Sequence, residues 1–148
     1  MKQYYSYKEF KTDTNLLRKK LIDEDITSIL AVARGGLCLA HCLAEGLNIR
    51  EVQSIRTELY DDDCKREAIE FFGDCNFKHG TKVLVVDDIA DSGETLKYVM
   101  EYLRKNFKDI KFVTATLFYK KSSIFKPDMY MQETDKWIEF FWEVDFLS

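Results

Sequence analysis

The sequence predicts an α/β fold, in which a mainly parallel, twisted sheet is flanked by helices. The first observation behind this class is that short apolar runs, typical of buried strands, alternate with segments whose apolar residues recur at helical spacing. The second is that two of these runs, residues 28–33 and 83–86, are each followed by a glycine-containing turn and a helical pattern. Parallel strands need crossover helices of this kind, whereas antiparallel strands do not.

The composition bounds the class of protein. The chain has 148 residues, of which 46% are hydrophobic, so we expect residues 1–148 to form a single domain with a packed core. With a net charge of −4, the chain lacks the excess of positive charge that is typical of general nucleic-acid binders, and no nucleic-acid partner is expected. We recognise neither a signal peptide nor an apolar run of ~20 residues, so no membrane partner is expected. The cysteines form no CxxC pair, which favours reduced thiols and a cytoplasmic location.

The first half of the chain reads as helix, strand, helix, strand. Residues 7 to about 24 place apolar side chains on one helical face, and Ser6 stands where an N-cap belongs. Residues 28–33 are expected to form a buried strand that breaks at a glycine pair. A second helix should run to about residue 47, since apolar residues recur at helical spacing up to a glycine near its end. Residues 51 to about 59 should form the next strand.

The second half contains the most polar segment and then a further alternation. Residues 60–80 are polar and irregular, and a loop of this length in a compact domain is often functional or mobile. Residues 83–86 are expected to form a buried strand, followed by a helix with apolar spacing from Leu96 to Phe107. Residues 111–118 are rich in strand-forming side chains, and a last short strand is expected over residues 136–140.

Three carboxylates follow the second buried strand. Asp87 and Asp88 come directly after it, and Asp91 comes three residues later, before a small-residue turn and a helix. Free N–H groups and the dipole at a helix N-terminus favour binding of a phosphate. Two ionised groups at the end of a buried strand repel each other and lose hydration. A ligand or Mg²⁺ role is therefore favoured over the alternative, in which one carboxylate caps a turn while the other is solvated.

The first buried strand ends at Arg34, Gly35 and Gly36. In parallel α/β sheets, ligands bind at the carboxyl ends of the strands, and both glycine-containing turns lie at such ends. Backbone N–H groups and a fixed guanidinium would bind an anion bidentately. The alternative is that Arg34 pairs with a surface carboxylate.

Residues 83–95 resemble the phosphoribosyl-pyrophosphate (PRPP) motif of the type I phosphoribosyltransferases, and the two loops occur in that family's order and spacing. The resemblance covers residues 29–143 and leaves the N-terminal helix unmatched. It implies the family's α/β sheet with a flexible flap over PRPP and a short C-terminal hood that binds the base. Residues 60–80 lie where the family has its flap, and Lys65 and Arg66 within them are either pyrophosphate contacts on closure or a solvated charge run.

The resemblance also implies a role for each residue of the two loops. Asp87 and Asp88 would bind the ribose hydroxyls and Mg²⁺. Arg34 and Gly35 would bind pyrophosphate, in a loop that often has a non-proline cis peptide bond just before the arginine. The residues implied to hold the 5′-phosphate are Asp91, Ser92, Gly93, Glu94 and Thr95.

Asp91 discriminates between branches of the family. This position is typically Asp in the enzymes that act on 6-oxopurines, where it serves near purine N7 as the candidate catalytic acid/base, and is usually non-acidic in the adenine and orotate types. The resemblance therefore favours guanine, xanthine or hypoxanthine. The alternative is an N-cap that satisfies the start of the helix, and both roles are compatible.

The C-terminal segment is similar to that of the bacterial xanthine–guanine enzymes. By this resemblance Lys120 would donate to purine O6, with Lys121 as the alternative one position away. Trp137 would stack on the base, and Ile138 would accept through its carbonyl. The chain has Phe141 where the family commonly has proline, and Trp142 is expected to pack in the core or at a subunit interface.

These features predict a purine phosphoribosyltransferase of purine salvage. It would transfer the 5-phosphoribosyl group from PRPP to N9 of a 6-oxopurine and release pyrophosphate, with Mg²⁺ as cofactor. The alternative is a catalytically inactive regulatory protein of the same fold that binds PRPP or nucleotide. A receiver domain is disfavoured, because about eighty residues precede the strand that resembles its first strand and because the strand that ends near Tyr119 offers no acceptor aspartate. The family resemblance and aromatic residues favour a homodimer or homotetramer.

Overall fold

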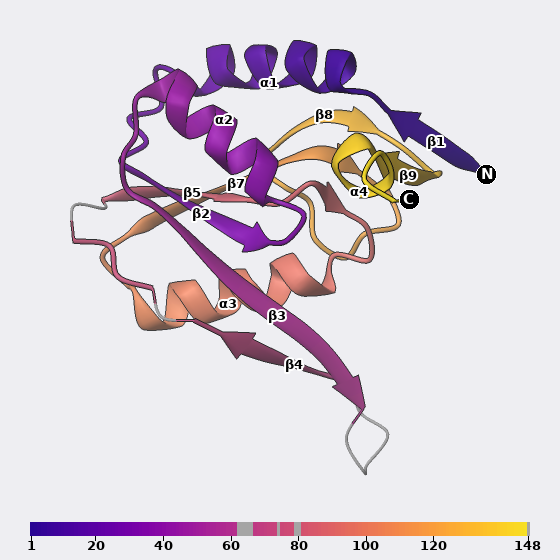
Figure 1. Ribbon diagram of the computed structural model, residues 1–148. Coiled ribbons are helices and arrows are strands. Elements are labelled where there is room, and N and C mark those ends of the chain that lie inside the picture. The colour runs from indigo at the N-terminus through magenta and orange to yellow at the C-terminus, as the bar shows by residue number, and fades with distance from the viewer. Residues whose placement is uncertain (62–66, 74, 79–80, 148) are drawn as a thin grey trace.

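The computed structural model describes residues 1–61, 67–73, 75–78 and 81–147. Helices cover both faces of one large sheet, and a small second sheet lies near the termini (Figure 1). The strands are β1 (Lys2–Tyr5), β2 (Ser28–Ala33), β3 (Val52–Asp61), β4 (Glu67–Phe72), β5 (Lys82–Val86), β6 (Ile89–Ala90), β7 (Lys111–Tyr119), β8 (Met129–Glu133) and β9 (Trp137–Phe140). The helices are α1 (Tyr7–Leu21), α2 (Leu37–Leu47), α3 (Glu94–Asn106) and α4 (Phe141–Val144).

The large sheet has seven strands in the order β4-β3-β2-β5-β7-β6, and β8 also pairs with β7. Every pair in this sheet is parallel except β3 with β4. The central strands β2, β5 and β7 are buried along nearly their whole length, as expected of parallel strands that helices cover on both faces. The predicted fold class is confirmed.

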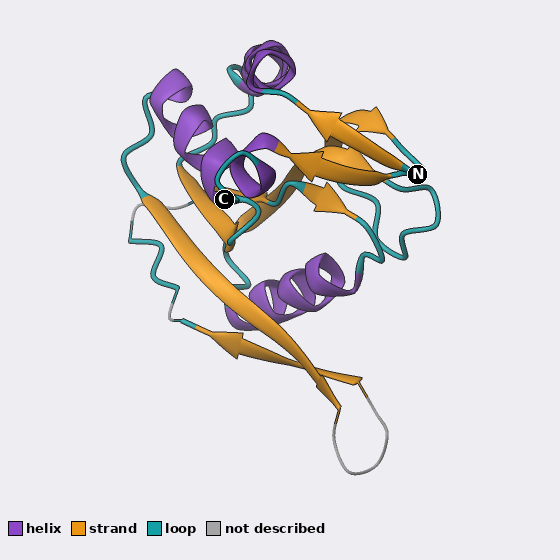
Figure 2. Cartoon of the chain, turned by 45° about the vertical axis from the view of Figure 1, so that its right-hand side comes forward, coloured by secondary structure: helices purple, strands orange, loops and turns teal. Residues whose placement is uncertain are grey.

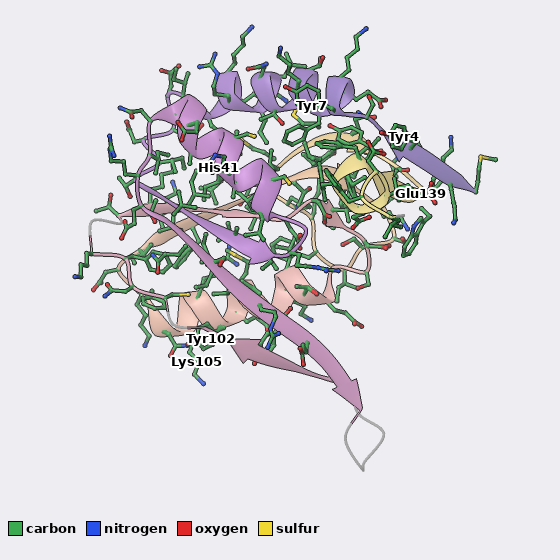
Figure 3. The ribbon with its side chains drawn as sticks, viewed as in Figure 1. Tyr4, Tyr7, His41, Tyr102, Lys105 and Glu139 are labelled. Atoms are coloured by element: carbon green, nitrogen blue, oxygen red, sulfur yellow. The ribbon has the colours of Figure 1, made fainter. Side chains whose placement is uncertain are left out.

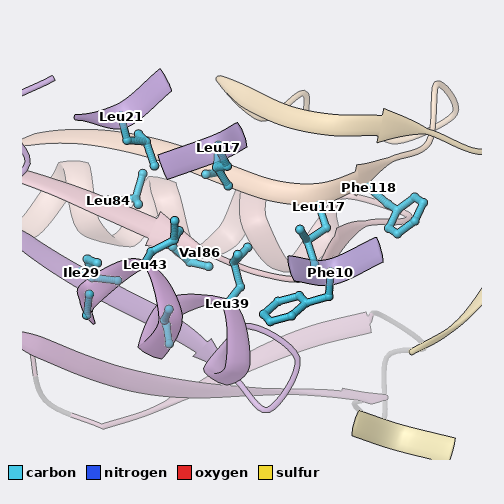
Figure 4. Packing of buried hydrophobic residues seen from close by; sticks show 14 of the residues in the cluster. Phe10, Leu17, Leu21, Ile29, Leu39, Leu43, Leu84, Val86, Leu117 and Phe118 are labelled. Atoms are coloured by element: carbon cyan, nitrogen blue, oxygen red, sulfur yellow. The ribbon is translucent and has the colours of Figure 1, made fainter. Parts of the chain in front are cut away.

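Two hydrophobic cores hold the helices against this sheet. On one face, α1 and α2 bury Leu17, Leu39 and Leu43 against strand residues such as Leu84 (Figure 4). On the other face, α3 buries a stripe of Leu96, Val99, Met100 and Leu103. The predicted N-cap of α1 is confirmed: the Ser6 side chain accepts from the N–H of Glu9, and the Glu9 carboxylate accepts from the N–H of Ser6.

The predicted loop at residues 60–80 is wrong in part. Residues 67–72 form β4, which pairs antiparallel with the far half of β3 in a ribbon that projects from the body (Figures 1 and 2). β3 and β2 pair only as far as Arg56 opposite Ala33, so β3 extends beyond the edge at which β2 ends. Lys65 and Arg66 lie outside the described residues.

Short elements at the chain ends were not predicted. β1 pairs in parallel with β9, so that Tyr4 lies opposite Glu139 (Figure 3), and Lys2 forms an ion pair with Glu139 at 3.0 Å. The strand expected over residues 136–140 is confirmed as β9, whereas β1 and β8 have no counterpart in the sequence prediction. Among the described helices, none has the length and apolar character needed to cross a membrane.

Candidate active site

Three loops meet at one edge of the sheet, where β2, β5 and β7 end. Ala31 of β2 lies opposite Val86 of β5, which lies opposite Ala115 of β7. The loops after β2 and β5 therefore begin side by side. β7 continues beside β6 until Tyr119 lies opposite Ala90, so its loop begins next to Asp91. They carry the residues singled out from the sequence: Arg34 after β2, Asp87 and Asp88 after β5, and Lys120 after β7.

The acidic pair is held by the backbone. The N–H of Asp88 donates to Asp87 Oδ1 at 2.9 Å, and the N–H of Ile89 donates to Asp88 Oδ1 at 2.7 Å. The carbonyl of Asp88 in turn accepts from two N–H groups of β7. These bonds fix the direction of both carboxylates, and Asp88 retains only 7% of its exposure.

Burial makes the charged form of this pair costly. Desolvation raises the pKa of Asp87 well above its usual range, and repulsion from Asp88 adds to the effect. Desolvation also raises the pKa of Asp88 to about 6, and the negative charge of Glu143 on α4 contributes in the same direction. Glu143 was not singled out from the sequence, because only the fold brings α4 toward the end of β5. A cation bound by the pair would offset this cost.

The turn after the acidic pair surrounds a small cavity at the start of α3. Gly93 is the N-cap, with φ of 85°, and has no side chain with which to cap the helix. The alternative role of Asp91 as N-cap is therefore wrong. The N–H of Glu94 donates to Ser92 Oγ at 3.3 Å, and the first-turn N–H groups of α3 lack partners within the helix. The cavity of about 80 Å³ is lined by residues that include Asp87, Asp91, Ser92, Gly93 and Thr95.

Asp91 also lines a second, larger cavity of about 620 Å³ together with Lys120. Lys120 Nζ lies 2.8 Å from Asp91 Oδ1, and the lysine side chain is only 17% exposed. Lys121 instead pairs with Glu133 at 3.2 Å and is 79% exposed. Of the two adjacent lysines, the fold thus directs Lys120 to the predicted acid/base. Glu133 also lines this cavity and was not singled out from the sequence.

The loop after β2 packs directly against the acidic pair. The peptide bond between Ala33 and Arg34 is cis. A Cβ placed on Gly35 would lie 2.5 Å from Asp88 Oδ2, so only glycine fits there without a shift of the carboxylate. Among the described residues, no carboxylate forms an ion pair with Arg34, which is exposed. The guanidinium is therefore open to a ligand.

The predicted base-stacking pair lies on β9, apart from the larger cavity. Trp137 is 60% exposed and Ile138 is buried in the core, and neither side chain is among those lining that cavity. Trp142 packs as expected, with its ring stacked on Phe140 at 4.7 Å between centroids. Stacking of Trp137 on a base stays a prediction.

Comparison with known proteins identifies the family. The model of the phosphoribosyl transferase domain matches residues 1–148. The match therefore includes the N-terminal helix, which the sequence motifs had left out. The xanthine-guanine phosphoribosyltransferase of Idiomarina loihiensis is 34% identical over 145 residues, which are 95% of this chain and 86% of that protein.

Solved structures give the same result. The Helicobacter pylori xanthine-guanine-hypoxanthine phosphoribosyltransferase superimposes with a TM-score of 0.89 at 35% identity, covering 98% of this chain and 96% of that one. A purine phosphoribosyltransferase from Pyrococcus horikoshii superimposes with a TM-score of 0.81 at 32% identity, covering 96% and 94%. Together with the sheet topology and the acidic pair before the α3 turn, these matches show that the chain belongs to the type I phosphoribosyltransferase family.

Proposed function

We propose that this enzyme transfers the 5-phosphoribosyl group from PRPP to N9 of a 6-oxopurine and releases pyrophosphate, a reaction of purine salvage. The observation that carries the proposal is the position of Asp91. This residue lines both the small cavity at the α3 N-terminus and the larger cavity beside Lys120. With the 5′-phosphate assigned to the small cavity and the base to the larger one, this carboxylate lies beside both. The names of the similar enzymes, which act on guanine, xanthine and hypoxanthine, support the same substrates.

On the base side, we assign acid/base chemistry to Asp91 and recognition of O6 to Lys120. The bond from N9 to C1 of the ribose forms as the bond from C1 to pyrophosphate breaks, and Asp91 accepts the proton that N7 loses. The ammonium of Lys120 donates to O6. A 6-amino purine has a donor group in place of O6 and could not accept this hydrogen bond. Their 2.8 Å ion pair supports this assignment, because N7 and O6 are neighbours on one edge of the purine. Trp137 and Ile138 are proposed to complete the base site.

On the PRPP side, two loops would bind different parts of the substrate. We assign the 5′-phosphate to the turn at Asp91, Ser92, Gly93, Glu94 and Thr95, and the departing pyrophosphate to Arg34 and the N–H groups near Gly35. The open guanidinium of Arg34 supports the second assignment. Developing charge on pyrophosphate is then stabilised by groups already in position.

Mg²⁺ fits the acidic pair. Asp87 and Asp88 have pKa values raised by burial, so a divalent cation beside them relieves the cost of ionising both carboxyl groups. No cluster of three or more ligating side chains occurs among the described residues, which matches a metal that takes its remaining ligands from substrate oxygens and water. Asp87 and Asp88 would hold Mg²⁺, which when bound neutralises pyrophosphate charge.

One assay tests the proposal against its alternative. The protein is mixed with Mg²⁺ and PRPP and with guanine, xanthine, hypoxanthine, adenine or uracil, and pyrophosphate release is followed. We expect turnover with at least one oxopurine and none with uracil. Absence of turnover with every oxopurine, together with retained PRPP binding, would favour the regulatory protein instead.

We further propose a cytoplasmic homodimer or homotetramer. Apolar side chains such as Tyr7, Leu37 and Val52 are 42–60% exposed, and surfaces of this kind are often covered on self-association. Cys38 and Cys42 are free thiols, which suits a reducing compartment. Sedimentation equilibrium tests the assembly, and a monomer at micromolar concentration would contradict it.

A further inference from the structure

The loop that follows β7, residues 120–125, is attached at two points, once to the end of β6 and once to the turn before α3. The N–H of Lys120 donates to the carbonyl of Ala90 at 3.0 Å, and the N–H of Ile124 donates to the carbonyl of Ser92 at 2.9 Å. The N–H of Ser123 closes the loop on the carbonyl of Lys120 at 2.9 Å. The loop therefore lies along the turn as a second layer.

This layer leaves no space behind Gly93. A Cβ on Gly93 would collide with Ser123 Oγ, and it would lie 2.6 Å from the backbone nitrogen of Phe125. Gly93 also lines the small cavity of about 80 Å³, whereas Ser123 is not among its lining residues. Gly93 thus borders the cavity and also contacts Ser123 on the side where a Cβ would project.

The hydroxyl of Ser123 is used entirely within its own loop. It donates to the carbonyl of Phe125 at 2.7 Å and accepts from the N–H of Phe125 at 3.2 Å. These two bonds hold the side chain against Gly93, and they leave the hydroxyl with no O–H to donate to a phosphate. Ser123 therefore acts on the turn by contact alone.

We propose that Ser123 is a positioning residue for the PRPP 5′-phosphate, which it serves by supporting Gly93 from behind. The inference rests on the proposed function, because it takes this turn as the phosphate site. A turn fixed in advance loses little conformational entropy when phosphate binds, whereas a loosened turn must be ordered by the ligand and binds it more weakly. Lys120 is anchored separately at Ala90, so base recognition does not depend on the Ser123 side chain.

Steady-state kinetics of Ser123→Ala and Ser123→Gly test this role. We expect the KM for PRPP to rise by roughly three- to tenfold in Ser123→Ala and further in Ser123→Gly, as each step removes part of the support. The kcat at saturating PRPP and the KM for the base should stay within about twofold of wild type, because bound phosphate restores the turn. Ser54→Ala, the same change at an exposed site on β3, is the matched control and should leave all three constants at wild-type values.

Each alternative result has a definite meaning. An unchanged KM for PRPP in both Ser123 variants would overturn the inference. If both KM values rose and kcat fell to a similar extent, and the Tm was lowered, the role of Ser123 would be merely structural. That result would also overturn the inference. Wild-type protein that turns over no oxopurine would refute the proposed function itself, which the Ser123 variants cannot do.

Discussion

Asp91 lies where the phosphate-sized cavity meets the larger one, and its carboxylate contacts a mostly buried ammonium. We expect Asp91→Asn to lower kcat by roughly 100-fold or more, because the amide keeps the shape but cannot accept the N7 proton. The KM for PRPP should change by only a few-fold, since backbone N–H groups of the turn remain. Initial rates over PRPP and base concentrations measure both constants.

The control for this experiment is Asp109→Asn, which makes the same change at an exposed position in the loop between α3 and β7. It should have wild-type kinetics. The Tm of Asp91→Asn should stay close to wild type, because an ion pair whose carboxylate is 49% exposed contributes little to stability. Wild-type kcat in Asp91→Asn would remove this residue from the mechanism.

Asp88 should make the stability of the metal-free protein depend on pH. Its folded pKa of about 6 lies above the ordinary aspartate value of 3.8, so between these values the folded state binds more protons than the unfolded state. By linkage, the contribution of Asp88 is fully present below about pH 4 and is lost as pH rises through about 6.

Asp88→Asn removes the charge and keeps an oxygen that can accept from the N–H of Ile89. In buffer without Mg²⁺, we therefore expect the Tm of this variant to exceed that of wild type at pH 7, by a margin that shrinks toward pH 4.5. Thermal melts across this range give the difference at each pH. A margin that is constant or that grows toward low pH would contradict the expected direction of the pH dependence.

Among the helices and strands, those that are determined by a local sequence pattern are predicted best. β2 has the predicted bounds and β5 differs from prediction by one residue, because each is a continuous apolar run. β1 and β4 were not predicted, because each depends on its partner. β1 is four residues long and pairs with β9 at the other end of the chain, and β4 depends on the extension of β3 beyond β2.

The N-terminal elements are joined to the sheet by a partly buried polar contact that gives a stability prediction. The Tyr5 hydroxyl donates to Asp13 of α1 at 2.6 Å, and the same carboxylate oxygen of Asp13 accepts from Gln132 of β8 at 2.8 Å. Tyr5 has 0% exposure, and burial with its bond to Asp13 raises its pKa. Tyr5→Phe should lower the free energy of unfolding by about 1–3 kcal/mol, because Asp13 loses a buried donor.

Tyr4 provides the matched control. Its hydroxyl also donates to a carboxylate, that of Asp145, but Tyr4 is 48% exposed. Water replaces the lost donor there, so Tyr4→Phe should cost less than about 1 kcal/mol. Urea denaturation of both variants gives the comparison, and equal costs would show that burial does not set the strength of these bonds.

For the whole molecule, the sequence predicted which loops carry the site but not how they meet. The motifs at Arg34 and Asp87 were readable because each follows a buried strand, and strand ends converge by topology. The sequence could not decide between Lys120 and Lys121. Adjacent residues in extended chain point in opposite directions, and only the fold shows that Lys120 is the one beside Asp91. Glu133 could not be predicted either, since it reaches the cavity only through the pairing of β8 with β7.

The contact between the loops after β2 and β5 yields the last prediction. A Cβ on Gly35 would lie 2.5 Å from the Asp88 carboxylate, which is buried and can move aside only by giving up its bond to the N–H of Ile89. Gly35→Ala should therefore raise the KM for PRPP and lower kcat/KM by roughly tenfold or more, because it displaces the carboxylate that we propose binds PRPP together with the loop that we assign to pyrophosphate.

Gly46→Ala is the control, because it causes similar steric crowding at a position outside the candidate site. Its Cβ would lie 2.6 Å from Cδ of Arg18, but that long side chain can rotate away, and alanine favours the helical backbone of α2 by up to about 1 kcal/mol over glycine. We expect wild-type kinetics and an equal or higher Tm for Gly46→Ala. If Gly35→Ala retained the wild-type KM for PRPP while Gly46→Ala behaved as expected, the two loops would bind PRPP independently and the contact at Gly35 would have no part in forming the site.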